Sequence, residues 1–534
     1  MHTKFIFVTG GVCSSLGKGI SASSIGAIFE AMKFNVVMTK IDPYINIDAG
    51  TMSPFQHGEV YVTDDGSETD LDLGNYERFL NISVSSKNSI TTGQIYDEVI
   101  KRERHGKYLG KCVQVIPHIT DEIKRRIKKN VDKDTDILII EIGGTVGDIE
   151  STPFLEAARQ FSADVGRENV LYVHLTLIPS ISGAGELKTK PTQHSVQKLR
   201  EIGIQPDLLI CRMDEKMDQS MKKKLALFTN VPENGIIEAV NIKHSIYEIP
   251  LEFKNQNLPE FIINRFNLEN RNCDLSIWEN LINSIISATK KVKIAVVGKY
   301  VDLPDAYKSI YESLYHASYN NNLKLELTKI NSESVSEENV ALKLKGFDGI
   351  LVPGGFGDRG IEGMIATAKY ARENNIPYFG ICLGMQIMVI EYARSKLCLT
   401  DANSTEFDPH SSAPVISLLE EQEGINEKGG TMRLGENVSI IIKDTHLYQA
   451  YSKDQISERH RHRYEFNNRY KEALQNAGLI ISATTEDGSL VESVEWSGHK
   501  LGFGVQYHPE FKSKPFKPHP LFNLFIKKSS IKEA

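Results

Sequence analysis

A cysteine, a histidine and a glutamate in the C-terminal half of the chain have the residue types of a nucleophile and its base. Residues 376–386 read Ile-Pro-Tyr-Phe-Gly-Ile-Cys-Leu-Gly-Met-Gln, a strand pattern that runs into Cys382 and then into a helical pattern. Such a turn lifts a nucleophile clear of a sheet, and the following helix N-terminus favours the thiolate. His508 and Glu510 follow a second apolar strand, 500–506, and could serve as base and orienting group. The pattern predicts attack by a thiolate.

The N-terminal region carries a second pattern, typical of phosphate binding. A strand-like run from Phe5 leads through Thr-Gly-Gly-Val-Cys-Ser-Ser-Leu-Gly-Lys-Gly into a helical pattern. Backbone amides in such a loop form an anion site, and Lys18 adds a charge for the outer phosphates. The loop departs from the usual motif, because one extra residue lies between Gly11 and Gly17, and Gly19 replaces the metal-holding Ser or Thr. The alternative is a glycine-rich turn with one exposed lysine.

Triphosphate chemistry needs a hard cation with oxygen ligands, and two carboxylates could hold it. Glu141 ends an apolar strand pattern, and Asp72 lies in an acidic turn, where a helix-capping role is the alternative interpretation. The segment 185–194 gathers two lysines, two threonines and a glutamine, which suits a second phosphate chain or, alternatively, an ordinary exposed basic loop.

The elements expected to position these residues alternate between strand and helix, which predicts an α/β fold with two parallel-sheet domains. The predicted domains are 1–266, a linker with a helix at 267–290, and 291–534. Strands are expected at 4–9, 35–41, 137–142, 170–177 and 207–211 in the first domain, and from 291 and at 348–352, 376–381 and 500–506 in the second. A mobile polar loop is expected at 420–430.

Length and composition narrow the class of protein. The 534 residues exceed what one hydrophobic core organises, and 40% hydrophobic with 25% charged residues is typical of globular enzymes. A net charge of −7 with dispersed lysines and arginines argues against nucleic-acid binding. No apolar stretch approaches membrane-spanning length, and six scattered cysteines suit a reducing compartment, so we expect a cytoplasmic protein without membrane partners.

Several longer strings together resemble the CTP synthase family. In the N-terminal half they are Gly-Gly-Val-Cys-Ser-Ser-Leu-Gly-Lys-Gly-Ile and the segments 40–46, 50–60, 141–150 and 188–196. In the C-terminal half they are the segments 353–357, 380–386, 403–407, 459–465 and 508–510, which resemble a class I glutamine amidotransferase domain. The resemblance spans nearly the whole chain. It implies a phosphate-loop synthetase domain followed by a glutaminase domain.

The resemblance implies ATP-dependent amination of UTP to CTP, the final step of CTP synthesis, with ammonia released from glutamine by Cys382, His508 and Glu510. Glutamine would be bound by Gly355, Leu383, Gly384, Met385, Gln386, Glu406 and Arg463, of which Gly355 and the Leu383 amide would form the oxyanion hole. The ammonia would pass through the protein interior to the UTP site.

By the same resemblance, Asp72 and Glu141 would hold Mg²⁺. ATP would contact Ser15, Leu16, Gly17, Lys18, Gly19, Ile20 and Asp72, with Val240, Asn241 and Ile242 near the adenine. UTP or CTP would contact Ser14, Asp148, Ile149, Glu150, Lys188, Thr189, Lys190, Pro191, Thr192, Gln193 and Lys224. The string Val-Asn-Ile at 240–242 departs from the family's basic-Asp-Val, so the adenine contacts rest on position alone.

The family also implies CTP as feedback inhibitor, GTP as allosteric activator and a homotetramer. One rival is another ATP-using amidotransferase of the cobyric-acid synthase type, which the Lys-Thr-Lys-Pro-Thr-Gln segment at 188–193 disfavours. A second rival is an assembly protein that has kept the fold but lost the chemistry, which the presence of Cys382, His508, Lys18 and Glu141 argues against. Filament formation in addition to catalysis is compatible with these residues. Neither His57 nor His118 is assigned a role.

Overall fold

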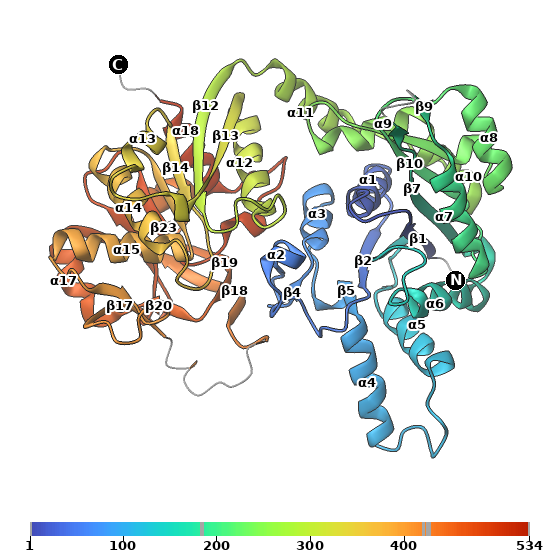
Figure 1. Ribbon diagram of the computed structural model, residues 1–534, viewed down its shortest axis with the longest axis horizontal. Coiled ribbons are helices and arrows are strands. Elements are labelled where there is room, and N and C mark those ends of the chain that lie inside the picture. The colour runs from blue at the N-terminus through green and yellow to red at the C-terminus, as the bar shows by residue number, and fades with distance from the viewer. Residues whose placement is uncertain (1–2, 182–185, 419–421, 423–428, 532–534) are drawn as a thin grey trace. The chain divides into compact units, whose positions relative to one another are not determined.

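A computed structural model describes residues 3–181, 186–418, 422 and 429–531, and it divides into two compact units (Figure 1). Unit 1 comprises Met1–Asp48 and Asp72–Asn283, and unit 2 comprises Ala49–Leu71 and Ser284–Ala534. Most of the predicted loop at 420–430 lies outside the described residues, as does Gly185. The predicted domain limits 1–266 and 291–534 stay predictions. The compact units are not continuous in sequence, because residues 49–71 pack with unit 2.

Unit 1 is built on a seven-stranded sheet in the order β11-β10-β7-β1-β6-β2-β5, and every pairing is parallel. Its strands are β1 Lys4–Gly10, β2 Val36–Asp42, β5 Ser89–Thr91, β6 Ile137–Ile142, β7 Val170–Leu177, β10 Leu208–Met213 and β11 Ile236–Val240, with a small hairpin of β8 Ser180–Ile181 and β9 Glu186–Leu187. All six residues of β6 are buried, as expected for a central parallel strand covered on both faces. The α/β prediction for this half is confirmed.

Helices cover this sheet (Figure 1). Phe5 and Ile140 of the sheet belong to one buried cluster with Ile123 of α5 and Phe161 of α6. The helices of unit 1 are α1 Lys18–Ala31, α3 Asp72–Phe79, α4 Thr92–Arg104, α5 Thr120–Lys129, α6 Thr152–Val165, α7 Lys190–Glu201, α8 Gln219–Thr229, α9 Ile249–Asn255 and α10 Leu258–Phe266. Helix α11, Ser276–Ser287, contains the boundary between the units.

Unit 2 contains a nine-stranded sheet in the order β13-β12-β14-β15-β23-β22-β21-β18-β19. The first five strands in this order pair in parallel and the remaining pairings are antiparallel. Its strands are β12 Lys290–Gly298, β13 Leu323–Asn331, β14 Gly349–Val352, β15 Tyr378–Ile381, β18 Arg433–Ile441, β19 Gln455–His462, β21 Leu479–Thr484, β22 Val491–Trp496 and β23 Gly502–Val505. The sequence indicated the parallel half but not the antiparallel one.

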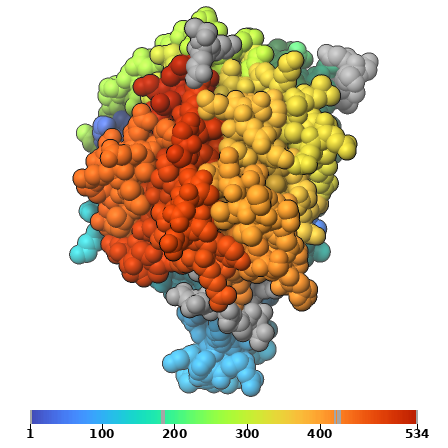
Figure 2. All heavy atoms as spheres, turned by 90° about the vertical axis from the view of Figure 1, so that its left-hand side faces the viewer, coloured from blue at the N-terminus to red at the C-terminus, as the bar shows by residue number. Residues whose placement is uncertain are grey.

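Smaller elements complete unit 2. They are the three-stranded sheet of β16 Ala402–Ser404, β17 Ala413–Leu418 and β20 Tyr464–Phe466, the hairpin of β3 Tyr61–Val62 and β4 Glu68–Thr69, and the helices α2 Pro54–His57, α12 Lys308–Asn320, α13 Val340–Leu344, α14 Ile361–Glu373, α15 Leu383–Lys396, α16 His446–Tyr451, α17 Lys471–Asn476 and α18 Pro520–Ser529. On the face in Figure 2, segments from the middle of the chain (yellow) and its C-terminal part (red) adjoin. No helix in the described ranges is both long and apolar enough to span a bilayer.

Residues 49–71, which we call the inserted segment, are held in unit 2 by buried polar contacts. The Glu59 carboxylate accepts hydrogen bonds from the backbone N–H of Ser309, at 3.1 Å from both oxygens. Arg459 Nε donates to Asp64 at 2.6 Å, and Arg461 Nε donates to Glu68 at 2.8 Å. Because Arg459 is only 2% exposed, its pairing within unit 2 depends on a carboxylate supplied by the inserted segment.

Candidate active sites

Cys382 lies in a tight turn between β15 and α15, as the sequence predicts. Its φ of +52° is rare for a residue with a side chain. The turn is possible because both flanking glycines approach other backbone closely: a Cβ on Gly380 would lie 2.5 Å from the Gly384 carbonyl, and a Cβ on Gly384 would lie 2.0 Å from the Val352 oxygen. The Cys382 side chain therefore lies at the N-terminus of α15.

His508 and Glu510 meet the thiol from the turn after β23. His508 Nδ1 and Glu510 Oε1 are 2.8 Å apart, which orients the imidazole. Burial by itself would lower the pKa of His508, but the negative charges of Glu510 and Cys382 outweigh it and raise this pKa to about 10. Gly354 lies beside both partners, since a Cβ there would be 3.1 Å from His508 Cε1 and 3.6 Å from Cys382 Cβ. Cys382, His508 and Glu510 thus line one site, in which His508 Nε2 has no hydrogen-bond partner among the described residues.

A small cavity of about 70 Å³ adjoins these three side chains. Its walls include Gly355 and Arg461, together with Pro54, Glu59 and Val60 from the inserted segment. The volume admits molecules of the size of water. The inserted segment therefore closes one side of a pocket that opens onto the candidate nucleophile.

Two backbone amides predicted for the oxyanion hole flank this pocket. Gly355 lines the cavity, and Leu383 is the first residue of α15. Neither amide has a backbone acceptor within the described residues, so both could donate to an oxyanion near Cys382. Gly384 and Met385, by contrast, face packed protein: Gly384 lies against Val352, and the Met385 Cα lies 2.8 Å from the Cβ position of Gly504.

The remaining predicted glutamine contacts do not line the small cavity. Gln386 Nε2 donates to the Tyr464 carbonyl at 2.9 Å and is 3.3 Å from Gln506 Oε1. Glu406 accepts from the Gly357 amide at 2.7 Å, and burial raises the pKa of its carboxyl. Arg463 donates to Gln422 at 2.6 Å and to Thr431 at 2.9 Å. These side chains are thus engaged with protein groups.

The phosphate loop in unit 1 connects β1 to α1. Gly17 has a φ of +87° and directly precedes α1. Lys18 Nζ donates to the Gly144 carbonyl at 2.8 Å, and burial lowers the pKa of this lysine. Gly19 has no room for a side chain, because a Cβ would lie 1.9 Å from Asp72 Oδ1. Gly19, which replaces the Ser or Thr of the usual phosphate-loop motif, therefore leaves room for the Asp72 carboxylate beside the loop.

Asp72 and Glu141 are brought together by Lys40. The Lys40 ammonium contacts Asp72 and lies 3.3 Å from Glu141 Oε1. The Tyr76 hydroxyl donates to Glu141 Oε2 at 2.5 Å. Within the described residues no group of three or more His, Cys, Asp or Glu could hold a metal ion. Two carboxylates around one cation still fit Mg²⁺, which is often held by one or two carboxylates together with waters and substrate phosphates.

A larger pocket of about 710 Å³ adjoins the phosphate loop. Ser15, Leu16, Gly17 and Ile20 line it from the loop, and Val240, Asn241 and Ile242 line it from the end of β11. A pocket of this size takes a nucleotide-sized ligand. The loop and the segment expected near the adenine thus share one cavity.

The residues predicted for UTP fall into two groups. Ser14 and the Asp148–Glu150 turn lie in loops at the carboxyl ends of β1 and β6, and Ile149 is 86% exposed. Lys188, Thr189, Lys190, Pro191, Thr192 and Gln193 lie at the start of α7, and Lys224 lies in α8. Thr192 is fully buried and donates to the Leu177 carbonyl at 3.0 Å. No hydrogen bond or ion pair in the described parts of the chain joins the two groups.

Four residues at these sites were not predicted. Lys40 and Tyr76 contact the carboxylates, and His174 bridges Thr9 and Ser195 behind the phosphate loop at 2.8 Å on each side. Gln506 donates to Cys382 Sγ at 3.6 Å. Burial lowers the pKa of His174 to about 3, so its imidazole is neutral. Lys40 lies in the segment 40–46 and Gln506 ends the predicted strand 500–506. Their places in these motifs were the only sequence features that could have pointed to them.

Both halves of the chain match known protein families. The family model "CTP synthase N-terminus" matches residues 4–268, and "Glutamine amidotransferase class-I" matches 302–528. A CTP synthase of a Hydrogenobaculum species is 55% identical over 530 residues, 99% of this chain and 98% of its own. CTP synthases of Aquifex aeolicus and Nitratidesulfovibrio vulgaris are 54% and 52% identical, covering 98% and 100% of this chain and 98% and 100% of their own.

One solved structure, the glutaminase domain of Trypanosoma brucei CTPS with bound acivicin, is 39% identical, with a TM-score of 0.43. The match covers 46% of this chain and 95% of the other.

Proposed function

Because the chain belongs to the CTP synthase family, ligases that make CTP from UTP with ATP and glutamine, we propose how its two units divide the reaction. Unit 2 releases ammonia from glutamine, and unit 1 uses ATP to attach that ammonia to UTP. The observation that carries this division is the assembled Cys382, His508 and Glu510 constellation in unit 2, separate in sequence from the phosphate loop of unit 1.

In unit 2, the thiolate of Cys382 attacks the side-chain amide carbon of glutamine. His508, kept protonated at neutral pH by its raised pKa, gives its proton to the departing ammonia. The resulting glutamyl thioester is hydrolysed by water, with His508 now taking a proton. Glu510 holds the imidazole in its productive orientation, and the amides of Gly355 and Leu383 donate to the oxyanion.

Glutamine is held by polar groups around the nucleophile. Glu406 binds its amino group and Arg463 its carboxylate, with Gln386, Gly384 and Met385 completing the site. Glu406 accepts from the Gly357 amide and Arg463 donates to the Gln422 side chain, so glutamine binding would replace these two partners.

The small cavity beside Cys382 suits the transfer of ammonia. In bulk water at neutral pH ammonia is mostly the non-nucleophilic ammonium ion. Val60 and Pro54 of the inserted segment wall one side of this cavity and would shield the released ammonia from bulk water there.

In unit 1, Ser15–Ile20 bind the ATP phosphates and Lys18 places a charge on the outer ones. Val240–Ile242 form the wall of the adenine pocket. Asp72 and Glu141 hold Mg²⁺, which when bound supplies the charge neutralisation that phosphoryl transfer requires. The transferred phosphoryl group joins the pyrimidine carbonyl oxygen of UTP. Ammonia then attacks that ring carbon, and inorganic phosphate leaves to give CTP.

UTP is bound through its triphosphate by Ser14, the segment Lys188–Gln193 and Lys224, whose charges match it. Asp148, Ile149 and Glu150 contact the pyrimidine side, where CTP binds as feedback inhibitor. Membership of the CTP synthase family supports a homotetramer. GTP activation, further assembly into filaments and a cytoplasmic location remain predictions.

An absorbance assay of UTP conversion tests this function. The purified chain with Mg²⁺, ATP and UTP should form CTP with either glutamine or ammonium chloride, and should form none when ATP is left out. If the uracil spectrum stays unchanged even at high ammonium concentration, the proposed function is wrong.

A further inference from the structure

A second cavity in unit 1 shares no lining residue with the pocket beside the phosphate loop. It has a volume of about 550 Å³, within the range of ligand sites, and lies between α4, α5 and the edge strand β5. None of the residues predicted for ATP, UTP or Mg²⁺ lines it. Its lining residues are Ser86, Lys87, Ser89, Ile90, Gln94, Glu98, Arg102, Arg125, Arg126, Lys129 and Asn130.

The lining is strongly cationic in a chain of net charge −7. It contains two lysines and three arginines but a single acid, Glu98. When Glu122 behind the arginines is also counted, an excess of three positive charges remains. Like charges repel, so the positive charge left after these pairings favours the binding of an anion there.

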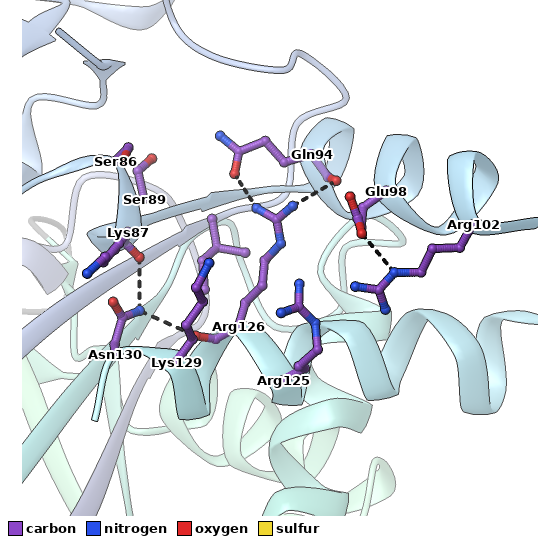
Figure 3. A pocket seen from close by; sticks show the side chains of 11 residues that line it. Ser86, Lys87, Ser89, Gln94, Glu98, Arg102, Arg125, Arg126, Lys129 and Asn130 are labelled. Carbon is purple, nitrogen blue, oxygen red and sulfur yellow. Dashed lines mark hydrogen bonds and ion pairs between the residues drawn. The ribbon is translucent and has the colours of Figure 1, made fainter. Parts of the chain in front are cut away.

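The three arginines are held in place by the buried Glu122. Arg125 makes two hydrogen bonds of 2.7 Å to its carboxylate, Arg126 Nε donates to it at 3.0 Å, and Arg102 Nη1 lies 3.1 Å away. Burial would raise the pKa of Glu122, but Arg125 and Arg126 hold this pKa below its ordinary value. The guanidinium groups are therefore fixed beside the cavity (Figure 3). Arg126 also donates to Gln94 Oε1 at 2.9 Å and Arg102 Nε donates to Glu98 at 2.7 Å, so the arginines act on an anion chiefly through their charge.

The two lysines are the available charges. Neither Lys87 nor Lys129 makes an ion pair or a side-chain hydrogen bond within the described ranges, and both side chains are exposed. The loop that carries Lys87 is fixed, because buried Asn130 donates to the Lys87 carbonyl at 2.9 Å (Figure 3). The cavity thus combines positioned arginines with two lysines that can move onto a ligand.

The rest of the lining indicates which part of a ligand is recognised. It contains no aromatic side chain, and Ile90 is its only large apolar residue, so a nucleobase would find little to stack on. Serines, a glutamine and an asparagine supply further hydrogen-bonding groups. We propose that this cavity is a binding site for small polyphosphates, which it recognises through their phosphates and without discrimination between bases.

Hydrogen–deuterium exchange on the full-length protein, titrated with inorganic tripolyphosphate, tests the site directly. Peptides covering 84–104 and 120–131 should become protected. In the Lys87→Gln/Lys129→Gln variant the midpoint of that protection should rise about tenfold or more, because two charge-assisted contacts are lost. Protection of the phosphate loop at 10–22, a separate triphosphate site, should be the same in both proteins and serves as the internal reference.

Two control variants keep the result specific. Lys345→Gln/Lys453→Gln removes the same charge from exposed positions of unit 2 and should leave the midpoint unchanged. Lys87→Arg/Lys129→Arg keeps the charges and should retain binding. ATP, GTP and CTP should protect the two peptides with similar midpoints, and added salt should weaken all three.

Equal protection in wild type and Lys87→Gln/Lys129→Gln would overturn the proposal. So would protection that grows with protein concentration in the absence of polyphosphate, since the cavity would then receive an acidic segment of another copy. A marked preference for one base would also contradict recognition through phosphates alone.

Discussion

The two candidate active sites differ in how their charged side chains are arranged. In unit 2 the nucleophile, base and orienting acid are already assembled, with His508 and Glu510 at 2.8 Å and Cys382 fixed in its turn. In unit 1 the carboxylates proposed for Mg²⁺ are bridged by the ammonium of Lys40. A covalent catalyst depends on the fixed geometry of its side chains, whereas the two carboxylates of unit 1 share a protein cation.

Replacing Cys382 with Ala separates the two sites most sharply. Glutamine-dependent CTP formation should fall by about 10⁶-fold, as for other lost nucleophiles, while ammonia-dependent formation stays near the wild-type rate. The absorbance assay with each nitrogen source measures both. Equal loss of both activities would refute the division between the units.

Lys18→Ala should lower both activities by about 100- to 1,000-fold, because a charge positioned on the transferred phosphate is lost. The matched control is Lys345→Gln, an exposed lysine of unit 2, which should leave both unchanged. Steady-state rates with glutamine and with ammonium chloride measure the effect. A variant that lost only the glutamine reaction would show that the phosphate loop is not shared by the two routes.

Lys40→Gln tests whether unit 1 relies on a protein cation. Removing it leaves Asp72 and Glu141 facing each other, and breaking a buried ion pair typically costs about 3 to 5 kcal/mol of unfolding free energy. Urea unfolding without metal should show the loss, and Mg²⁺ should restore more stability to the variant than to wild type. Identical Mg²⁺ effects on both proteins would place the metal elsewhere.

The last prediction concerns the charge on His508. Its pKa is about 10 in the folded chain against an ordinary 6.5, so the stability gained by protonation is fully present below pH 6.5 and is lost as pH rises through 10. In Glu510→Gln the pKa should drop, and less stability should be lost over that interval. Urea midpoints measured from pH 6 to pH 10 compare the two proteins, and parallel curves would mean that Glu510 does not set this pKa.

Much of both sites could be predicted because local sequence determines them. The strand, glycine loop and helix around Lys18, and the strand, cysteine and helix around Cys382, are continuous patterns, and the structure has the expected elements at both places. His508 and Glu510 are two residues apart, so their contact also follows from a short motif.

What the sequence did not reveal depends on contacts between distant residues. Lys40 meets Glu141 across 101 positions, and Gln506 meets Cys382 across 124. Strand β19 reads Gln-Ile-Ser-Glu-Arg-His-Arg-His, which looks like an exposed polar segment. It is largely buried because the inserted segment supplies carboxylates to Arg459 and Arg461. The residues near β19 in the sequence do not indicate that Arg459 and Arg461 pair with these carboxylates.

The inserted segment has a consequence for how this enzyme can be divided. The chain passes from one unit to the other at 48/49, 71/72 and 283/284, so a single proteolytic cut near residue 284 gives two fragments, and the first of them still carries the inserted segment that packs in unit 2. A fragment beginning at residue 291 would expose Arg459 without its counter-charge and open the wall beside Cys382. A gene truncated or exchanged at that point would therefore encode a glutaminase unit whose site beside Cys382 lacks one wall. The unit that releases ammonia and the unit that uses it cannot be separated in this chain by a cut at one position of the sequence.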